Sequence, residues 1–365
     1  MRVTLVVSSN KHTGAAAVAE LLARSLHAAG AEATLLFIGG NNLEERLLGQ
    51  AWALPHLVKE RRPGHVRANL AAIRAAAADS QVVLSHLNHD HLLCVAAGLH
   101  KRSLLVRNFR NPSHFRADPY HRHLARRVTG AVLASSSFEP RLARLCGPIP
   151  RLCLPVPVED RFAPGADRTA WRDRFGIPHE AQVVGMVGKL APGRGFELLL
   201  ETAARIDSGP HVLAVGHGEA QPRLERLAAR LGIAERLHWA GYQEQALPEL
   251  YGAMDVLLFA APGSDHGHRA LSEAQGCGCP VVAAAVPGVE DLVVDGRTGR
   301  VVQATAADLA RAVAELLADR AAAARLAAAG REAVTERRLA PSGECLLRFL
   351  EEVRGVVGSG SRSSA

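Results

Sequence analysis

The sequence predicts an α/β protein with two doubly wound parallel sheets, one in each half of the chain. Short apolar runs rich in valine, leucine and isoleucine alternate with helical segments, which is typical of strands that are buried on both faces. The alternation restarts after an extended segment at residues 152–162, where Pro155 and Pro157 disfavour a helix. A length of 365 residues also indicates two domains.

The first half begins as a strand, a helix and a second strand. Residues 3–8 form an apolar run that predicts a buried strand, Gly14 begins a helix that Gly30 ends, and residues 33–38 are the next strand. Because ligands of open α/β sheets bind beyond the carboxyl ends of the strands, the turn at Gly14 is expected to contact a ligand. Further strands are predicted at residues 82–85, 104–106 and 131–134, and further helices at residues 42–51, at residues 66–78 and from Phe138 onward.

The second half repeats this alternation without repeating the sequence. Its strands are predicted at residues 183–187, 211–215, 237–240, 256–260 and 280–286, and its helices at residues 196–206, 223–231, 247–254, 269–276, 306–317, 320–329 and 341–356. We therefore expect a domain at residues 1–157, a second domain at residues 158–338, a last helix at residues 339–357 and a disordered tail at residues 358–365, where serine and glycine dominate.

Composition excludes several classes of protein. The six cysteines include no Cys-x-x-Cys pair, which argues against a disulfide framework or a zinc site and for a reducing compartment. Neither a signal-peptide pattern nor an apolar run of membrane-spanning length is present, so a cytoplasmic location is expected. The net charge is +7, but no zinc-finger, RNA-recognition or basic-zipper signature occurs, so nucleic acid is not an expected partner.

Positive charge is concentrated between residues 101 and 127. Such a stretch is either a solvated surface or a contact for an anionic partner, and the second interpretation fits a peripheral contact with the inner face of the cytoplasmic membrane. Only Asp118 opposes the cations of this stretch, which are Lys101, Arg102, Arg107, Arg110, Arg116, Arg122, Arg126 and Arg127.

A polar cluster follows the predicted strand at residues 82–85. It contains His86, His89, Asp90 and His91, and it lies at the carboxyl end of the strand, where a ligand is expected. The spacing of these side chains is not that of a standard metal-ligand set, so no metal site is predicted.

The loop at residues 188–195 (GKLAPGRG) leads from a strand to a helix and carries two cations, Lys189 and Arg194. A pyrophosphate group gains negative charge as its bond to a sugar breaks, and both side chains could reach that charge. The alternative is that they are two surface cations. The loop does not match the GxxxxGK[ST] pattern, and no GxGxxG fingerprint follows the first strand, which argues against an oxidoreductase.

The stretch at residues 265–280 (DHGHRALSEAQGCGCP) places two carboxylates, Asp265 and Glu273, on either side of a glycine-containing turn. A helix is predicted from near Arg269 to Gly276, and its amino end favours an anion such as phosphate. One carboxylate near a sugar and one near a ribose, with a phosphate between them, suit a nucleotide-sugar site. This spacing also occurs by chance in most proteins, so the interpretation depends on the neighbouring motifs.

Four blocks of the second half resemble the retaining glycosyltransferases of family 4, which have the GT-B architecture. The blocks are VGMVGKLAPGRGFELLL, VLAVGHGE, LHWAGYQEQALPELYGAMDVLLFAA and GSDHGHRALSEAQGCGCPVVAAAVPGVEDLVVDGRTG, and they occur in the family's order between residues 183 and 302. The first half resembles the family through VVSSNKHTGAA. The resemblance implies that two Rossmann-like domains face each other across a cleft and that the last helix crosses back onto the first domain.

The resemblance also implies roles for particular residues. The first domain would bind an acceptor and the second a nucleoside-diphosphate-sugar, with no cofactor or metal ion. In catalysis, Lys189 and Arg194 would hold the diphosphate, Asp265 would contact the donor sugar, and Glu273 would bind the ribose hydroxyls.

Further donor contacts and a set of acceptor-side residues follow from the same resemblance. The implied donor-binding residues are Gly14, Gly188, Gly216, Gly241, Tyr242, Gly267, His268, Arg269, Ala270 and Leu271. The implied acceptor-side residues are Thr13, His86, Arg107, Arg110 and His114.

The sequence departs from the family pattern within these motifs. Asp265 stands where the family usually has glutamate, and the family's EGFG is replaced by DHGH. Lys189 precedes Arg194, whereas the family usually has arginine first and lysine second. The histidine that the family places near the scissile bond has no clear counterpart, although His114 follows the corresponding strand.

The expected function is the retaining transfer of a sugar from a nucleoside-diphosphate-sugar to a glycan or lipid-linked acceptor, in cell-envelope or polysaccharide biosynthesis. Two alternatives stay open: an epimerase or phosphorylase of the same architecture, and a non-catalytic module that binds nucleotide sugars. A phosphorylase would need a lysine for pyridoxal phosphate, and the second domain offers none in its cleft apart from Lys189.

Overall fold

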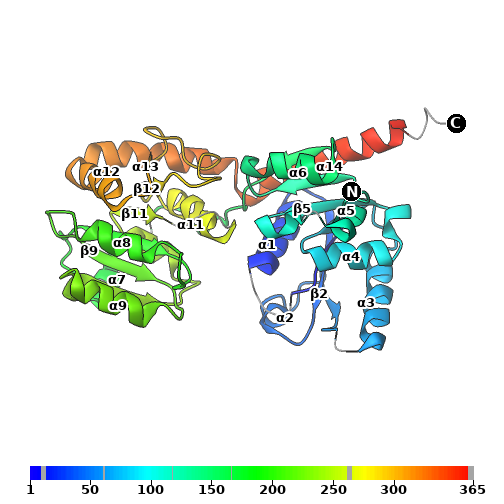
Figure 1. Ribbon diagram of the computed structural model, residues 1–365, viewed down its shortest axis with the longest axis horizontal. Coiled ribbons are helices and arrows are strands. Elements are labelled where there is room, and N and C mark those ends of the chain that lie inside the picture. The colour runs from blue at the N-terminus through cyan, green and yellow to red at the C-terminus, as the bar shows by residue number, and fades with distance from the viewer. Residues whose placement is uncertain (10–13, 61, 117, 166, 261–264, 361–365) are drawn as a thin grey trace. The chain divides into compact units, whose positions relative to one another are not determined.

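The computed structural model describes residues 1–9, 14–60, 62–116, 118–165, 167–260 and 265–360, without the side chains of residues 265–267 and 358–360. The chain divides into two compact units (Figure 1). Unit 1 comprises Met1–Pro157 and Arg337–Ala365, and unit 2 comprises Val158–Glu336. Each unit is built on a parallel sheet with alternating helices, which confirms the predicted fold class.

The sheet of unit 1 has the strand order β3-β2-β1-β4-β5-β6-β7, and every neighbouring pair is parallel. The strands are β1 (Arg2–Val7), β2 (Glu32–Ile38), β3 (Ala53–Leu57), β4 (Val82–Ser85), β5 (Leu104–Phe109), β6 (Gly130–Leu133) and β7 (Arg151–Cys153). The helices are α1 (Gly14–Ala28), α2 (Asn42–Arg46), α3 (Pro63–Ala76), α4 (Asn88–Ala96), α5 (Pro119–Ala125), α6 (Glu139–Cys146) and α14 (Leu339–Gly360).

The sheet of unit 2 has the order β10-β9-β8-β11-β12-β13 and is also parallel throughout. Its strands are β8 (Val183–Val187), β9 (His211–Val215), β10 (Leu237–Gly241), β11 (Val256–Phe259), β12 (Val281–Ala284) and β13 (Arg300–Val302). Its helices are α7 (Thr169–Arg174), α8 (Phe196–Ala203), α9 (Gln221–Arg230), α10 (Leu247–Ala253), α11 (Asp265–Gly276), α12 (Ala306–Ala318) and α13 (Arg320–Thr335).

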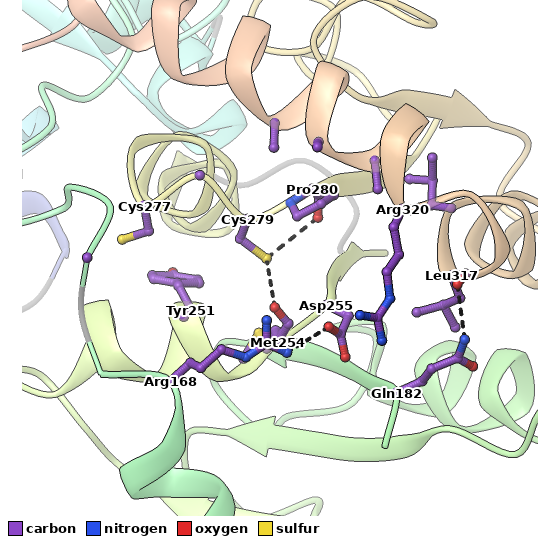
Figure 2. A pocket seen from close by; sticks show the side chains of 17 residues that line it. Arg168, Gln182, Tyr251, Met254, Asp255, Cys277, Cys279, Pro280, Leu317 and Arg320 are labelled. Carbon is purple, nitrogen blue, oxygen red and sulfur yellow. Dashed lines mark hydrogen bonds and ion pairs between the residues drawn. The ribbon is translucent and has the colours of Figure 1, made fainter. Parts of the chain in front are cut away.

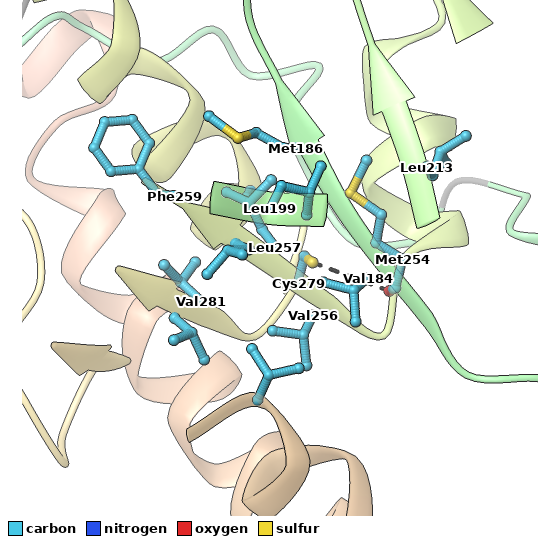
Figure 3. Close-up of a cluster of buried hydrophobic side chains, with 14 of the residues drawn as sticks. Val184, Met186, Leu199, Leu213, Met254, Val256, Leu257, Phe259, Cys279 and Val281 are labelled. Atoms are coloured by element: carbon cyan, nitrogen blue, oxygen red, sulfur yellow. Dashed lines mark hydrogen bonds between the residues drawn. The ribbon is translucent and has the colours of Figure 1, made fainter. Parts of the chain in front are cut away.

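The core of unit 2 lies between this sheet and the helices that cover it (Figure 3). Val184, Met186, Leu257 and Val281 come from three neighbouring strands and are all buried, as is Leu199 of α8. The strands read as nearly continuous apolar runs because helices shield both faces of a parallel sheet from water. This explains why strands β8 to β12 could be predicted from their apolar runs.

Several predicted boundaries are wrong. Strands β3, β7 and β13 were not predicted, because β3 contains Pro55 and both β7 and β13 are only three residues long. Helix α11 begins at Asp265 and not near Arg269, so Asp265 and Glu273 belong to one helix. Helix α14 extends to Gly360 and includes the beginning of the tail that was predicted to be disordered, while residues 361–365 lie outside the described part.

Helix α14 packs against α1 within unit 1. The two helices approach so closely at Gly343 that an added Cβ atom would overlap the Ser25 carbonyl group. On the same helix, Gly355 is exposed and has no atom within 4 Å of the position of a Cβ. The backbones of α1 and α14 are thus in direct contact at Gly343.

We expect Gly343→Ala to lower the free energy of unfolding by about 1–3 kcal/mol, because a methyl group would push α14 away from α1. The matched variant Gly355→Ala should leave stability unchanged or raise it by up to about 1 kcal/mol, since alanine favours a helix. Urea denaturation followed by circular dichroism measures both values. Equal stability of the two variants would show that the close contact is absent.

Candidate functional site

The strand order of unit 2 reverses between β8 and β11. From β8 the chain builds outward through β9 and β10, and it then returns to β11 on the other side of β8. In open α/β sheets, ligands bind beyond the carboxyl ends of the strands at this reversal. The loop at residues 188–195 and the amino end of α11 therefore border the candidate site.

Backbone hydrogen bonds hold the loops after β8 and β9 together. The amide of Gly188 donates to the Val215 carbonyl (2.9 Å), and the amide of Leu190 donates to the His217 carbonyl (3.0 Å). The Leu190 carbonyl in turn accepts from the amide of Ala220 (2.9 Å). The parallel pairing of the two strands thus continues beyond their ends, and it fixes the loop that carries the predicted cations.

Glycines permit this close packing. The backbone of Gly216 has φ +136°, and a Cβ there would overlap the Gly188 carbonyl oxygen. A Cβ on Gly195, which has φ +85°, would lie 2.6 Å from the carbonyl carbon of Ala260 at the end of β11. Gly188, Gly216 and Gly241 were all predicted to bind a donor. In the structure their backbone groups hold the strand ends together, since the Gly216 amide donates to the Gly241 carbonyl (2.8 Å) and the Gly188 amide to the Val215 carbonyl.

Both predicted cations lie on this fixed loop. Lys189 is 63% exposed, and its ammonium group lies 3.6 Å from the Glu219 carboxylate. Arg194 is half-buried, one residue before the cap of α8. The pKa of Glu219 lies below its usual value, because its own backbone N–H and the nearby Lys189 both favour the carboxylate. The loop thus presents one exposed and one partly covered positive charge.

Glu273 is more deeply buried than its predicted role implies, since only 5% of its side chain is exposed. Its Oε2 accepts a hydrogen bond from the Tyr251 hydroxyl (3.0 Å), and its Oε1 accepts one from Arg269 Nε (2.5 Å). The negative charge of Glu273 raises the pKa of Arg269, and burial is the main cause of the raised pKa of Tyr251. Sequence reasoning missed Tyr251, whose position on α10 gave no signal of this contact.

The early start of α11 changes the predicted backbone contacts. Only the first four amides of a helix lack an intrahelical acceptor, so Arg269, Ala270 and Leu271 do not offer free amides to a phosphate. Ala270 and Leu271 are buried, and the His268 ring packs on Phe259 with 5.6 Å between ring centroids. Gly267 lies in the first turn, and the predicted sugar contact by the Asp265 side chain lies outside the described part of the structure.

Tyr242, predicted to border the nucleobase, lies directly after β10 and is 62% exposed. Its ring meets the His217 ring edge to face, with 5.5 Å between centroids. His217 is also exposed and belongs to the loop after β9. The two loops therefore present neighbouring aromatic rings at the same edge of the sheet, where a flat base could stack.

In unit 1 the strand order reverses between β1 and β4. Gly14 begins α1 near this point, and Thr13 lies outside the described residues. His86 follows β4, is buried, and makes no hydrogen bond through either ring nitrogen within the described part of the chain. Burial, helped by the nearby charges of Arg110 and His114, lowers the pKa of His86 to about 3.

Two cations of the predicted basic surface are buried instead. Arg107 is 1% exposed, donates to Asn88 and lies over the Phe109 ring. Arg110 donates to Asn108 Oδ1 (3.0 Å) and to the Leu154 carbonyl (2.8 Å). The reason is that β5 extends to Phe109, three residues further than predicted. The exposed cations of the stretch are Lys101, Arg102, Arg116, Arg122 and Arg126.

The structure thus brings four predicted acceptor-side residues together at the carboxyl ends of β4 and β5. All four are buried: His86, Arg107, Arg110 and His114. A further residue, Asp90, belongs to the same region. Its carboxylate accepts from the Ser8 amide (2.8 Å) and the Leu87 amide (2.7 Å), which joins the end of β1 to α4. Burial raises the pKa of Asp90.

A cavity of about 380 Å³ lies at the amino ends of the unit 2 strands, opposite the candidate site (Figure 2). It is lined by Gln182, Asp255 and Pro280, each of which directly precedes a strand. The Asp255 carboxylate is paired with Arg168 and with Arg172, at 2.9 Å in each case. Because this cavity lies at the amino ends of the strands and its carboxylate is already paired, it is not the predicted donor site.

Among the described residues, no group of three or more histidine, cysteine, aspartate or glutamate side chains is arranged to hold a metal ion. In the same part of the chain, none of the helices combines the length and apolar character needed to cross a bilayer.

Comparison with known proteins shows which family unit 2 resembles. Residues 167–333 match the model of the glycosyl transferases group 1 family. The matched residues include both predicted cations, Lys189 and Arg194, together with Glu273, and they lie within unit 2.

Curated relatives align with about half of the chain. A D-inositol 3-phosphate glycosyltransferase of Geodermatophilus obscurus is 41% identical over an alignment of 207 residues, with 52% of this chain and 46% of that protein covered. A GDP-mannose-dependent alpha-(1-6)-phosphatidylinositol monomannoside mannosyltransferase of Mycolicibacterium smegmatis is 36% identical over an alignment of 208 residues, with 52% of this chain and 53% of that protein covered. The chain thus spans about half the length of these relatives.

Solved structures resemble the whole chain in fold. HepE of Anabaena, crystallised with UDP and glucose, has a TM-score of 0.81 at 18% identity, with 98% of this chain and 100% of that chain covered. A sucrose-phosphate synthase of Thermosynechococcus elongatus has a TM-score of 0.77 at 19% identity, with the same two coverages. At these identities the likeness shows the GT-B fold alone.

The buried His86 makes stability depend on pH. The pKa of His86 in the folded protein is below the ordinary value of 6.5. Between about pH 6.5 and pH 3, His86 therefore binds more protons in the unfolded chain than in the folded chain. As a result, the stability of the protein decreases as the pH is lowered through this window. Between about pH 7.5 and pH 5, His86 should account for a loss of roughly 2 kcal/mol.

We therefore expect His86→Leu to show a smaller stability loss over this pH range than the unsubstituted protein. Urea denaturation at the two pH values measures the difference. Exposed His123 on α5 supplies the control variant His123→Leu, which should leave the pH dependence unchanged. An unaltered pH dependence in His86→Leu would contradict a neutral, buried imidazole.

Proposed function

We propose that the protein transfers a sugar from a nucleoside-diphosphate-sugar to a glycan or lipid-linked acceptor, with retention of the anomeric configuration. The proposal depends most on one observation: the loop of Lys189 and Arg194 is fixed at the strand reversal of unit 2, whose residues 167–333 match the glycosyl transferases group 1 family. A relative named for GDP-mannose and a fold neighbour crystallised with UDP and glucose are consistent with a nucleotide-sugar donor.

In the proposed reaction, the bond between the anomeric carbon and the diphosphate oxygen breaks, and the diphosphate leaves with the bonding electrons. Lys189 and Arg194 neutralise the charge that develops on it, and such fixed charges are commonly the largest catalytic contribution. The departing diphosphate oxygen takes the proton of the acceptor hydroxyl, whose oxygen bonds to the same face of the sugar. Because two side-chain cations supply the positive charge, we propose that no metal ion or cofactor is needed.

Glu273 and Tyr242 would hold the nucleoside part of the donor. The buried Glu273 carboxylate accepts one hydrogen bond from Tyr251 and one from Arg269. Its remaining lone pairs can accept hydrogen bonds from two ribose hydroxyls. The rings of Tyr242 and His217 would border the base. Asp265 would contact the sugar, as in the sequence-based expectation.

For the acceptor, we propose a glycan or a lipid-linked glycan of cell-envelope or polysaccharide biosynthesis, used on the cytoplasmic side of the membrane. The exposed cations Lys101, Arg102, Arg116, Arg122 and Arg126 favour a peripheral contact with anionic lipid, at about 1 kcal/mol for each cation near the surface. Arg107 and Arg110 do not contribute to this surface, because they are buried.

Removal of the guanidinium group in Arg194→Ala should lower the transfer rate by about 100-fold or more, because one stabilising group on the leaving diphosphate is lost. Arg230→Ala is the matched control, since Arg230 is exposed at the carboxyl end of α9. Product formation from radiolabelled UDP-glucose and GDP-mannose measures both rates. Turnover by Arg194→Ala at the unsubstituted rate would refute the role of Arg194.

A thermal-shift screen with UDP-, GDP- and ADP-sugars tests donor binding independently of turnover. A donor at about 100 times its Kd should stabilise the protein by about 2.7 kcal/mol, visible as a raised Tm. Stabilisation without any turnover would favour a non-catalytic binding module, and conversion of the free donor would favour an epimerase. Absence of stabilisation by all three donors would contradict the proposed donor class.

A further inference from the structure

Four charged side chains of unit 2 form a continuous series of contacts. Arg269 donates to Glu273 (2.5 Å), and its guanidinium also lies 3.8 Å from the Glu159 carboxylate. The same oxygen of Glu159 lies 3.2 Å from Arg161 Nε. Arg161 then donates to the Glu244 carbonyl (2.7 Å). Positive and negative groups thus alternate from α11 to the loop after β10.

The series connects two parts of the proposed donor site. Glu273 is the proposed ribose contact, and Glu244 follows Tyr242, whose hydroxyl donates to the Glu244 carboxylate (3.4 Å). Between them lies Glu159, the second residue of unit 2 after the chain leaves unit 1 at Pro157. The segment that joins the units is therefore in contact with the side of unit 2 that would hold a nucleoside.

Burial makes Arg269 important to both carboxylates. Glu159 and Glu273 are each less than 10% exposed, and a buried carboxylate is costly without a partner. Arg269 is near both, and its planar guanidinium can serve two carboxylates where a lysine ammonium cannot match the geometry. Of the contacts described above, only two remain when Arg269 is lost. Glu273 keeps its hydrogen bond from Tyr251, and Glu159 keeps its ion pair with Arg161.

We propose that Arg269 is a positioning residue that orients Glu273 for the ribose and couples nucleotide binding to the segment around Glu159. This inference rests on the proposed function. When ribose hydroxyls donate to the remaining lone pairs of Glu273, its oxygens become weaker acceptors for Arg269, and the balance of the Arg269 contacts shifts toward Glu159. Nucleotide binding should then change the hydrogen exchange of residues 158–163 as well as that of α11.

The test uses the full-length protein with UDP and GDP as probes. Hydrogen exchange of the peptides that cover residues 158–163 and 265–276 is measured with and without nucleotide, together with the nucleotide Kd. We expect both peptides to be protected. Arg269→Gln should weaken nucleotide binding about tenfold or more. Arg269→Lys should recover most of the affinity but not the protection of residues 158–163.

Glu159→Gln separates the coupling from the binding site. It should keep the nucleotide protection of residues 265–276 and lose that of residues 158–163. Added to Arg269→Gln, it should change the Kd no further, because Glu159 acts through Arg269. Glu315→Gln removes a carboxylate from a surface pair with Arg300 (2.6 Å) and is the matched control, with an unchanged exchange pattern.

Three results are decisive. Protection of both peptides, lost selectively in Glu159→Gln, supports the coupling. Protection of residues 265–276 alone in the unsubstituted protein overturns the coupling and leaves the donor site standing. Protection of neither peptide, with no measurable Kd for either nucleotide, overturns the donor site and the inference together.

Discussion

The candidate donor site depends on hydrogen bonds that extend the pairing of β8 and β9 past the ends of the strands. The Gly188 amide donates to the Val215 carbonyl at the end of β9, the Leu190 amide donates to the His217 carbonyl in the following loop, and the Ala220 amide donates to the Leu190 carbonyl. A side chain at Gly216 would separate these backbones, because its Cβ would overlap the Gly188 carbonyl oxygen. The positions of Lys189 and Arg194 therefore follow from contacts between main-chain atoms. Fixed positions matter here because charges that need no reorganisation stabilise a transition state best.

The two units use buried charge differently. In unit 2 the buried carboxylate of Glu273 is matched by a cation and a hydroxyl, so its charge is compensated. In unit 1 the buried imidazole of His86 has neither nitrogen bonded within the described residues, and Arg110 and His114 lie near it. The site in unit 2 thus contains paired charges, whereas the carboxyl ends of the unit 1 strands carry a neutral imidazole beside buried arginines.

The fold class and the loop cations could be predicted because their signals are local. A run such as that of β8 is apolar throughout, and the loop after it contains three glycines and both cations within eight residues. The short strand β7 and the proline-containing β3 gave no such signal, because sheet neighbours stabilise them. The early start of α11 also went unpredicted, since Asp265, His266 and Gly267 are weak helix formers.

The contacts of the site residues were harder to predict, since they involve partners far away in the sequence. Glu273 meets Tyr251 across 22 positions, and Arg110 meets Leu154 across 44. Arg107 and Arg110 were assigned to a basic surface from charge density, but Arg107 lies within β5, Arg110 directly follows it, and both are buried. Charge counts alone do not distinguish a surface cation from a buried one. To make that distinction, one has to know where the strand ends, and strand ends are the feature that sequence patterns locate least well.

The packing of α14 on α1 also has a consequence for synthesis on the ribosome. Unit 1 is assembled from the first 157 residues and the segment after Glu336, so its folding has to wait for the last helix to emerge. Unit 2 is contiguous and is complete earlier. Until α14 arrives, the apolar face of α1 that it covers is open to water and to chaperones. A nascent chain stalled before residue 339 would therefore combine a finished second unit with an unfinished first one.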